Sequence, residues 1–382
     1  MKLLFVIDHL GGGGAQRQLV NVAAGLRERG HAVTVFTYHR NDAHLARLEA
    51  AGAEHVHRPK RSRFDLGPLR ALHRMVRQDR PDVVVAFLRT PSFYVEAVHL
   101  LARSTPVIVS ERAGVEHRGL QVADIASGLG HLIATHLTAN SHDYLERLAR
   151  VLPIAGRSTV IYNGVEPKFF DAGRARIAQD EADAAQRCRL CVVSARVTRQ
   201  KGPMPLALAL STLREAGTEV DLDWIGPLDE ASPLVRDVKA VIAARGLDRR
   251  WRWLGRVADV ERAYGRYDGL VLPSVFEGVA NTMCEAMACG LPVIVTDIAD
   301  NARIVRDGVD GIVCRADDPA ALARAIARFV AMDVRARRRM GVSAQARARE
   351  LFSMDTLVGQ WEALCERIAT GAGNPDSNWQ RS

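Results

Sequence analysis

Two glutamates, Glu277 and Glu285, lie eight residues apart in the stretch FEGVANTMCEAMACGLPV, which carries no other charged residue. The preceding run, DGLVLPS, predicts a strand, and the stretch itself predicts a short helix capped by Asn281 or Thr282. Glu277 is then expected in the loop at the carboxyl edge of a sheet, and Glu285 about one turn into the helix. Two carboxylates beside free backbone N–H groups can hold a polyol that carries phosphate, because hydroxyls donate to the acids and amides bind anionic oxygens.

The backbone that follows the first acid supplies the other groups expected to face such a ligand, namely Gly278, Val279, Ala280, Asn281 and Thr282. A structural interpretation stays open beside this functional one. In it, Glu277 forms a local cap and Glu285 forms a salt bridge on a surface helix. The spacing of the two acids does not decide between the two interpretations.

Two cations, Arg196 and Lys201, flank a predicted turn in the stretch SARVTRQKG, which follows the apolar run LCVV. A turn at the end of a strand places both cations at the carboxyl edge of the sheet, on the same side as Glu277. Positive groups held there stabilise the charge that develops on a departing diphosphate, so no protein nucleophile is needed. Arg199 is the competing candidate, and we interpret it as a solvated surface residue.

A glycine-rich loop, HLGGGGAQR, connects the first strand-like run, KLLFVID, to an amphipathic helix. The loop does not complete the G-x-G-x-x-G pattern of dinucleotide-binding loops, because position 16 is Gln16. The second predicted strand ends in FTYHR and offers no acid for a ribose, so an oxidoreductase is poorly supported. A glycine loop that leads into a helix still lets backbone approach a phosphate closely, although a tight turn without a ligand would explain it too.

The elements that must position these groups repeat one pattern, apolar runs separated by amphipathic helices, in both halves of the chain. Near-continuous β-branched runs separated by helices indicate parallel sheets covered on both faces. We therefore expect an α/β protein with two doubly wound domains that bind ligands at the carboxyl ends of their sheets. The expected divisions are a first domain at 1–167, a linker with a surface helix at 168–188, a second domain at 189–350, a final helix at 351–372 and a tail at 373–382.

Together these motifs closely resemble the donor-binding signature of retaining glycosyltransferases of family 4. The resemblance rests on EGVANTMCEAMACGLPV with its flanking runs, on SARVTRQKG, on VIYNGV and on GGGGAQRQLVNVAAGLRERGHAV, and it covers about residues 1–368. It implies the GT-B fold, in which two Rossmann-like domains face a central cleft. It also implies that Glu277 contacts the transferred sugar and that Glu285 binds the nucleotide ribose. Arg196 and Lys201 are then expected to bind the diphosphate.

The same resemblance extends to other parts of the chain. It places the loop at Gly13 and Gly14 near the diphosphate and the acceptor, and the nucleotide base near Gly255 and Arg256. Retention in the family is explained by front-face attack, in which the leaving phosphate takes the acceptor proton. Such an enzyme needs no metal and no cofactor besides its nucleotide-sugar substrate, and its final helix returns to the first domain.

The chain departs from many family members after the run TPVIVSER. Those members carry a histidine there, whereas this chain has Ser110, Glu111 and Arg112. Because subfamilies with SER or SEH at this position exist, the resemblance stands. Glu111 is interpreted either as a base that activates the acceptor or as a partner of Arg112.

The whole chain has a formal net charge of +8. Most of this excess of basic residues lies in the first half. Residues 1–180 contain 24 basic and 17 acidic side chains, against 28 and 27 in residues 181–382. The stretch RPKRSRFDLGPLRALHRMVRQDRPD adds an apolar stripe, which consists of Leu66, Leu69, Leu72 and Val76. Cationic amphipathic segments suit anionic membrane surfaces, at about 1 kcal/mol per basic residue. We expect such contacts through Arg61 and Arg63, with an ordinary helix packed on its sheet as the alternative.

All six cysteines lie in the second half, and Cys188 and Cys191 form a C-x-x-C without a second pair at zinc spacing. We expect buried reduced thiols and no metal site. The apolar run at the start is too short for a signal segment, and no run reaches the ~20 residues of a membrane span. These observations favour a cytoplasmic protein.

The leading prediction is a glycosyltransferase that moves a hexose or N-acetylhexosamine from a nucleotide sugar, with uridine as the preferred base, to a glycan acceptor. Acceptors in the family are often lipid-linked glycans of cell-surface polysaccharide assembly, which favours a peripheral position on the inner face of the membrane. A nucleotide-sugar epimerase or hydrolase of the same fold is the first alternative. A non-catalytic protein that binds anions or nucleic acid is the second, although no nucleic-acid partner is expected.

Overall fold

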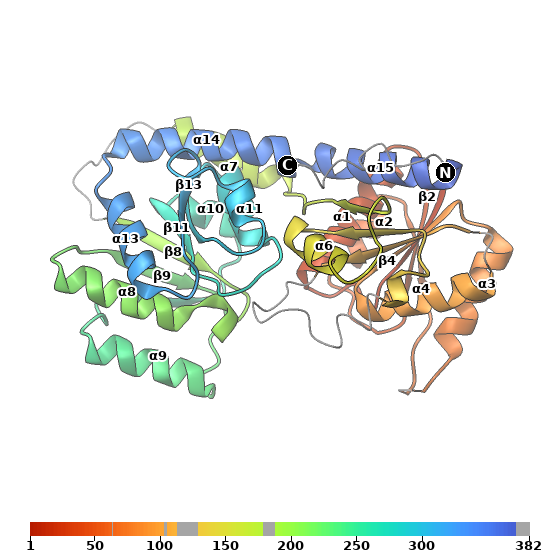
Figure 1. Ribbon diagram of the computed structural model, residues 1–382, viewed down its shortest axis with the longest axis horizontal. Helices are drawn as coiled ribbons and strands as arrows, with labels where there is room; N and C mark the ends of the chain where they lie inside the picture. Colours follow the sequence, from red (N-terminus) through yellow and green to blue (C-terminus); the bar gives the residue numbers. More distant parts are fainter. Residues whose placement is uncertain (63, 103–104, 113–128, 179–187, 372–382) are drawn as a thin grey trace. The chain divides into compact units, whose positions relative to one another are not determined.

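The computed structural model describes residues 1–62, 64–102, 105–112, 129–178 and 188–371 (Figure 1). Contacts within the chain separate two compact units. The first unit is Met1–Gly164 together with the chain from Met354 on, and the second is Val165–Ser353. Each unit contains one parallel sheet with helices on both faces, as the sequence pattern predicts.

The first unit has a seven-stranded parallel sheet in the order β3-β2-β1-β4-β5-β6-β7. Its strands are β1 (Lys2–Val6), β2 (Ala32–Thr37), β3 (Glu54–His57), β4 (Val83–Phe87), β5 (Val107–Glu111), β6 (His136–Ala139) and β7 (Ser158–Val160). Its described helices are α1 (Gly14–Glu28), α2 (Leu45–Ala50), α3 (Gly67–Asp79), α4 (Arg89–Leu101), α6 (His142–Ala149) and α15 (Met354–Thr370). Strand β3 was not predicted, because EHVH is short and polar and lies at the edge of the sheet.

Two apolar cores cover the two faces of this first sheet. Helices α1 and α15 pack on one face, where Leu19 and Trp361 meet the inward side chains of β1 and β4. Helices α3, α4 and α6 pack on the other face, around residues such as Leu72 and Tyr144. All five residues of β4 are buried, as expected for a central strand covered on both faces.

The second unit has a six-stranded parallel sheet in the order β10-β9-β8-β11-β12-β13. Its strands are β8 (Arg189–Val193), β9 (Asp221–Ile225), β10 (Trp251–Gly255), β11 (Gly269–Leu272), β12 (Val293–Thr296) and β13 (Gly311–Cys314). Its described helices are α7 (Pro167–Ala178), α8 (Pro203–Glu215), α9 (Pro233–Ala244), α10 (Val260–Tyr264), α11 (Asn281–Ala288), α12 (Asn301–Ile304), α13 (Pro319–Val330) and α14 (Val334–Phe352), with a short 3-10 turn at Arg199–Lys201.

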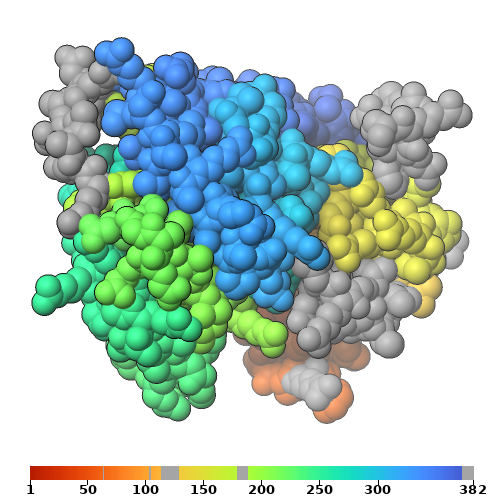
Figure 2. Space-filling view, turned by 60° about the vertical axis from the view of Figure 1, so that its left-hand side comes forward, coloured from red at the N-terminus to blue at the C-terminus, as the bar shows by residue number. Residues whose placement is uncertain are grey.

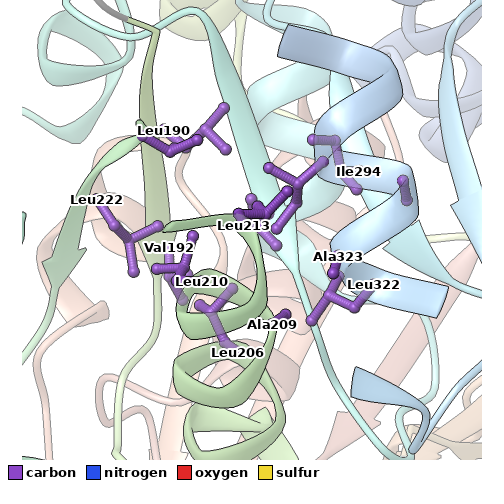
Figure 3. Packing of buried hydrophobic residues seen from close by; sticks show 14 of the residues in the cluster. Leu190, Val192, Leu206, Ala209, Leu210, Leu213, Leu222, Ile294, Leu322 and Ala323 are labelled. Carbon is purple, nitrogen blue, oxygen red and sulfur yellow. The ribbon is translucent and has the colours of Figure 1, made fainter. Parts of the chain in front are cut away.

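Helices also cover both faces of this second sheet. On one face, Leu206 and Leu210 of α8 meet Leu322 of α13 and side chains from the strands (Figure 3). Figure 2 shows the outer surface of this layer, where α8 and α9 (green) lie next to each other and α8 lies beside α13 (blue). On the other face α11, α14 and α7 pack together. The expected linker begins at 168, but residues 168–178 belong to helix α7 of the second unit, where Phe169 and Phe170 are buried.

Candidate active site

The order of strands in the second sheet defines where a ligand can bind. Strands β8 and β11 pair in the middle of the sheet, and the helices that follow them, α8 and α11, lie on opposite faces. The loops that leave the carboxyl ends of β8 and β11 therefore diverge and leave a crevice above the sheet edge, where doubly wound proteins bind ligands. The first loop contains Arg196 and Lys201, and the second contains Glu277.

Backbone contacts fix these two loops to each other. The N–H of Val275 donates to the carbonyl of Gln200 over 2.8 Å. Gly202 adopts a left-handed φ of 63°, and a Cβ at this position would lie 1.9 Å from the carbonyl oxygen of Pro273. Only glycine allows this approach, so Gly202 sets the spacing between the 3-10 turn and the Pro273 loop.

The carboxylate of Glu277 is the centre of the side-chain contacts between the loops. Lys201 Nζ forms an ion pair with Glu277 Oε1. Gln200 Nε2 donates to Oε2 over 3.1 Å, and Ser274 Oγ donates to Oε1 over 3.4 Å. The Glu277 side chain is 11% exposed and that of Lys201 is 23% exposed, so solvent reaches the pair only in part. Gln200 and Ser274 could not be predicted from the sequence, because neither carries a charge that a spacing argument could use.

Arg196 lies on the same loop, but none of the described contacts to Glu277 comes from it. Its side chain is exposed and has no ion-pair partner among the residues that the structure describes, while its carbonyl accepts a 2.7 Å hydrogen bond from Ser194 Oγ. Arg199 is exposed as well, in agreement with the expectation of a solvated residue. The loop after β8 therefore carries one paired lysine and two exposed arginines, Arg196 and Arg199, which have no ion-pair partner among the described residues.

Helix α11 supplies the second acid. The helix begins at Asn281, and its N-cap is Ala280, whose methyl side chain cannot accept a hydrogen bond from the first turn. The prediction of Asn281 or Thr282 as the N-cap was wrong. Glu285 lies just over one turn into the helix, as predicted, and is 6% exposed. Gly278, Val279 and Ala280 are buried at the start of this helix, whereas Thr282 is half-buried.

The predicted base-binding residues lie at the end of β10, along the same edge. Gly255 has a φ of 69°, and its carbonyl accepts a 2.7 Å hydrogen bond from Gly226 at the end of β9. A Cβ on Gly226 would lie 1.8 Å from the carbonyl oxygen of Ser194, so glycine is required there too. Arg256 is exposed. The ends of β8, β9 and β10 thus meet through backbone contacts.

In the first unit, the corresponding point lies between β1 and β4, and the glycine loop follows β1. Helix α1 begins at Gly14 with Gly13 as an N-cap without a side-chain hydrogen bond. Gln16 Nε2 donates to Asp8 Oδ1 over 3.1 Å across the loop. The role of Gly13 and Gly14 beside a donor stays a prediction.

The structure corrects the interpretation of Glu111 and Arg112. Glu111 is 2% exposed and pairs with His131, not with Arg112. The Arg112 guanidinium donates to Ser110 Oγ, to the Ile161 carbonyl and to Asn163 Oδ1, each over 3.0 Å. It also lies over the rings of Phe87 and Trp361, at 4.9 and 5.7 Å from their centroids. Arg112 therefore holds strand ends together, and Glu111 is too buried here to reach an acceptor.

Glu111 belongs to a buried triad. His131 Nδ1 lies 2.6 Å from Glu96 Oε1, and His131 Nε2 lies 3.0 Å from Glu111 Oε1. All three side chains are at most 5% exposed. Burial alone would lower the pKa of His131, but the hydrogen bonds and charges of Glu111 and Glu96 raise it to about 9. The imidazole is therefore charged at neutral pH, with a carboxylate on each side.

The apolar stripe of helix α3 faces the protein core. Leu72 and Val76 are fully buried against the sheet, and Leu69 packs at the edge of the same core. The interpretation of these three residues as a membrane-facing stripe was wrong, whereas Leu66 is 52% exposed. Arg63 lies outside the described residues.

All six cysteines lie in the described part of the chain and are buried there as free thiols, as predicted. Burial raises the pKa of Cys188 to about 12. In those ranges no three His, Cys, Asp or Glu side chains are grouped so that they could hold a metal ion. No described helix combines the length and apolar character needed to cross a bilayer.

Solved structures with the same architecture show which fold this protein has. A glycosyltransferase from Rickettsia africae matches with a TM-score of 0.79 over 97% of this chain and 99% of its own, at 18% identity. The Anabaena protein Alr3699/HepE, solved in complex with UDP, matches with a TM-score of 0.80 over 96% of this chain and 100% of its own, at 21% identity. The fold is that of the GT-B glycosyltransferases.

Sequence comparison gives the family. Residues 12–169 match the model described as Glycosyltransferase Family 4, and residues 187–332 match Glycosyl transferases group 1. The chain belongs to the family 4 glycosyltransferases. A Campylobacter jejuni α-1,4-N-acetyl-D-galactosaminyltransferase is 23% identical over 96% of this chain and 99% of its own length. A Rhizobium leguminosarum lipopolysaccharide core mannosyltransferase is 31% identical over 51% of this chain, and the match spans 58% of that relative.

Proposed function

We propose that the chain is a retaining glycosyltransferase that transfers a hexose or N-acetylhexosamine from a nucleotide sugar, UDP-linked in the first instance, to a glycan acceptor. The observation that carries the proposal is the contact between Lys201 and Glu277 at the carboxyl ends of the paired strands β8 and β11, with the exposed Arg196 on the same loop as Lys201. Cations for a diphosphate and a carboxylate for sugar hydroxyls then share one sheet edge. The similar Anabaena structures with UDP and with UDP-glucose favour a uridine donor.

The roles of the residues follow from their chemistry. Arg196 and Lys201 bind the diphosphate and stabilise the charge that it gains as the bond to the sugar breaks. Glu277 accepts hydrogen bonds from the sugar hydroxyls and orients the ring, and Glu285 accepts from the ribose. In front-face attack, the departing phosphate oxygen takes the proton of the acceptor hydroxyl, so no protein base is assigned to that step.

The ion pair between Lys201 and Glu277 has a consequence for donor binding. The lysine must exchange the carboxylate for the diphosphate, while the carboxylate exchanges the ammonium for sugar hydroxyls. Both side chains are mostly buried, so the exchange is favourable only because each charged group gains a new partner as it loses the old one. In the absence of donor, the pair keeps both charges compensated.

A donor screen tests this proposal. UDP-, GDP- and ADP-sugars are compared by thermal shift, because a ligand at 100 times its Kd stabilises the folded state by about 2.7 kcal/mol. We expect a clear rise in Tm with UDP-sugars and release of UDP in the presence of a glycan acceptor. Release of free sugar that needs no acceptor would instead favour a hydrolase, and no shift with any nucleotide sugar would contradict the proposal.

We further propose that the acceptor is lipid-linked and that the first unit contacts an anionic membrane surface. The Campylobacter relative is named for an undecaprenol-linked glycan. Helices α3 and α4 pack together. The segments from the loop before α3 to the end of α4 carry the exposed apolar residues Phe64, Leu66, Phe93, Leu100 and Leu101. Lys60 lies 5.3 Å from the ring centroid of Tyr94, and the Tyr94 ring lies 6.2 Å from that of Phe93, which places a cation near one of these apolar residues.

Vesicle flotation tests the membrane contact. We expect the protein to float with vesicles that contain acidic lipid and to lose most of this binding when Lys60 and Arg61 are changed to glutamate, since each basic residue contributes about 1 kcal/mol. The matched control reverses Arg249 and Arg266, which are exposed in the second unit. Binding that neither salt nor the Lys60 and Arg61 changes reduce would exclude this contact.

A further inference from the structure

Glu277 has two neutral hydrogen-bond donors besides Lys201, and the assigned functions leave them without a role. Building on the proposed function, we infer that Gln200 is a positioning residue. Gln200 keeps the Glu277 carboxylate in place for the sugar while Lys201 moves to the diphosphate. Ser274 supports the same carboxylate through its hydrogen bond to Oε1. Gln200 acts through Glu277 and is not assigned a contact with the donor.

The first support for this inference is the rigid placement of Gln200. Its carbonyl accepts from the N–H of Val275 over 2.8 Å, so the backbone of residue 200 is attached to the loop that carries Glu277. The next two residues are Lys201 and Gly202, and Gly202 is in contact with the Pro273 carbonyl. The 3.1 Å bond from Gln200 Nε2 to Glu277 Oε2 thus joins two segments that are already held together.

The second support is a chain of hydrogen bonds behind Ser274. This serine is fully buried, and its carbonyl accepts from Thr296 Oγ1 over 2.6 Å. The Thr296 carbonyl in turn accepts from Asn301 Nδ2 over 2.9 Å. Ser274 Oγ lies 3.4 Å from Glu277 Oε1. Ser274, Thr296 and Asn301 therefore form a hydrogen-bonded frame that extends across the ends of β11 and β12. This frame contains no charge that a diphosphate could attract.

The chemistry of the donors explains why they suit this task. An incoming diphosphate attracts a lysine or arginine away from a carboxylate, whereas a neutral amide or hydroxyl donor stays in place. When Lys201 leaves, Oε1 becomes available to a sugar hydroxyl and Gln200 still fixes Oε2. A carboxylate held in one orientation binds a sugar more tightly than one that must be ordered on binding.

The test compares a ligand without sugar to one with sugar. Isothermal titration is run with UDP and with UDP-glucose, and in parallel with GDP and GDP-mannose, on the wild-type chain and on Gln200→Ala. We expect the Kd for the nucleoside diphosphate to change less than twofold and the Kd for the nucleotide sugar to rise about 10-fold, as for a lost hydrogen bond to a charged group. Arg199→Ala is the matched control in the same turn and should change neither.

A second variant gives a readout that a purely structural role would not move. Gln200→Glu keeps the length of the side chain but places a second carboxylate next to Glu277, and two such groups disfavour each other's ionisation. The acidic limb of the pH profile of UDP-glucose binding should therefore move up by roughly one pH unit. Gln200→Ala removes one hydrogen bond to the carboxylate without adding a charge, so it should move that limb in the same direction but by less.

The outcomes separate this inference from the proposed function. If Gln200→Ala weakens UDP and UDP-glucose equally, or weakens neither, and if Gln200→Glu leaves the pH profile unchanged, Gln200 does not position Glu277. If the wild-type chain binds none of the four nucleotides, the proposed function itself fails. Unchanged unfolding of both variants in urea shows that the effects are local to the site.

Discussion

Changing Lys201 to alanine should lower kcat/KM for the nucleotide sugar by about 100- to 1,000-fold, and Arg196→Ala should have an effect of the same order. Both cations lie on the loop at the carboxyl end of β8, where the departing diphosphate gains charge under the proposed mechanism. Removing a preorganised positive group from such a site raises the barrier by about 3–4 kcal/mol. The measurement is the rate of nucleoside diphosphate release at limiting donor concentration.

The pattern across variants matters as much as the size of the effect. Both alanine variants should also weaken binding of the free nucleoside diphosphate, in contrast to Gln200→Ala, because the cations bind the diphosphate and not the sugar. Arg199→Ala, exposed in the same turn, is expected to retain the wild-type rate. A Lys201→Ala variant that keeps both its rate and its diphosphate affinity would remove the assignment of this loop to the donor.

Much of this site can be predicted from the sequence, because its parts follow strands with clear patterns. The runs LCVV and DGLVLPS predict strands, and the turn residues after them place Arg196, Lys201 and Glu277 at one edge. The pairing of Lys201 with Glu277 could not be predicted, since 76 residues separate them and the loop geometry decides which atoms meet. The role of Gln200 could not be predicted either, because a single uncharged side chain in a loop shows no charge or spacing pattern that indicates a function.

The interpretation of Glu111 failed for a reason that the sequence already contained. Glu111 ends β5 and Arg112 follows it directly, and successive side chains of a strand point to opposite faces of the sheet. Neighbours of this kind cannot pair with each other. The true partner of Glu111 is His131, which also pairs with Glu96 on α4, and these contacts depend on the tertiary fold. Leu72 and Val76 illustrate the same limit, because a periodic apolar stripe does not reveal whether it faces the core or a membrane.

The second large effect is expected at this buried triad and concerns stability. His131→Ala should destabilise the first unit by about 3–5 kcal/mol, because it leaves two buried carboxylates without their shared cation. The wild-type protein should show a matching dependence on pH. Since the folded-state pKa of His131 is raised from 6.5 to about 9, its contribution is complete below about pH 6.5 and is lost as the pH rises through about 9.

Hydrogen exchange followed by mass spectrometry distinguishes a local from a global effect. Peptides from β5 and β6 in the first unit should lose protection between pH 7 and 10 after correction for the intrinsic exchange rate, whereas β11 and β12 of the second unit are the internal reference. In His131→Ala this dependence should be absent and protection of β5 low throughout. The triple variant Glu96→Gln, His131→Ala, Glu111→Gln should regain part of the stability, because it buries no unpaired charge. If the single variant is as stable as the wild type at pH 7, the triad does not hold a charged imidazole, and the ends of β5 and α4 are fixed by packing alone.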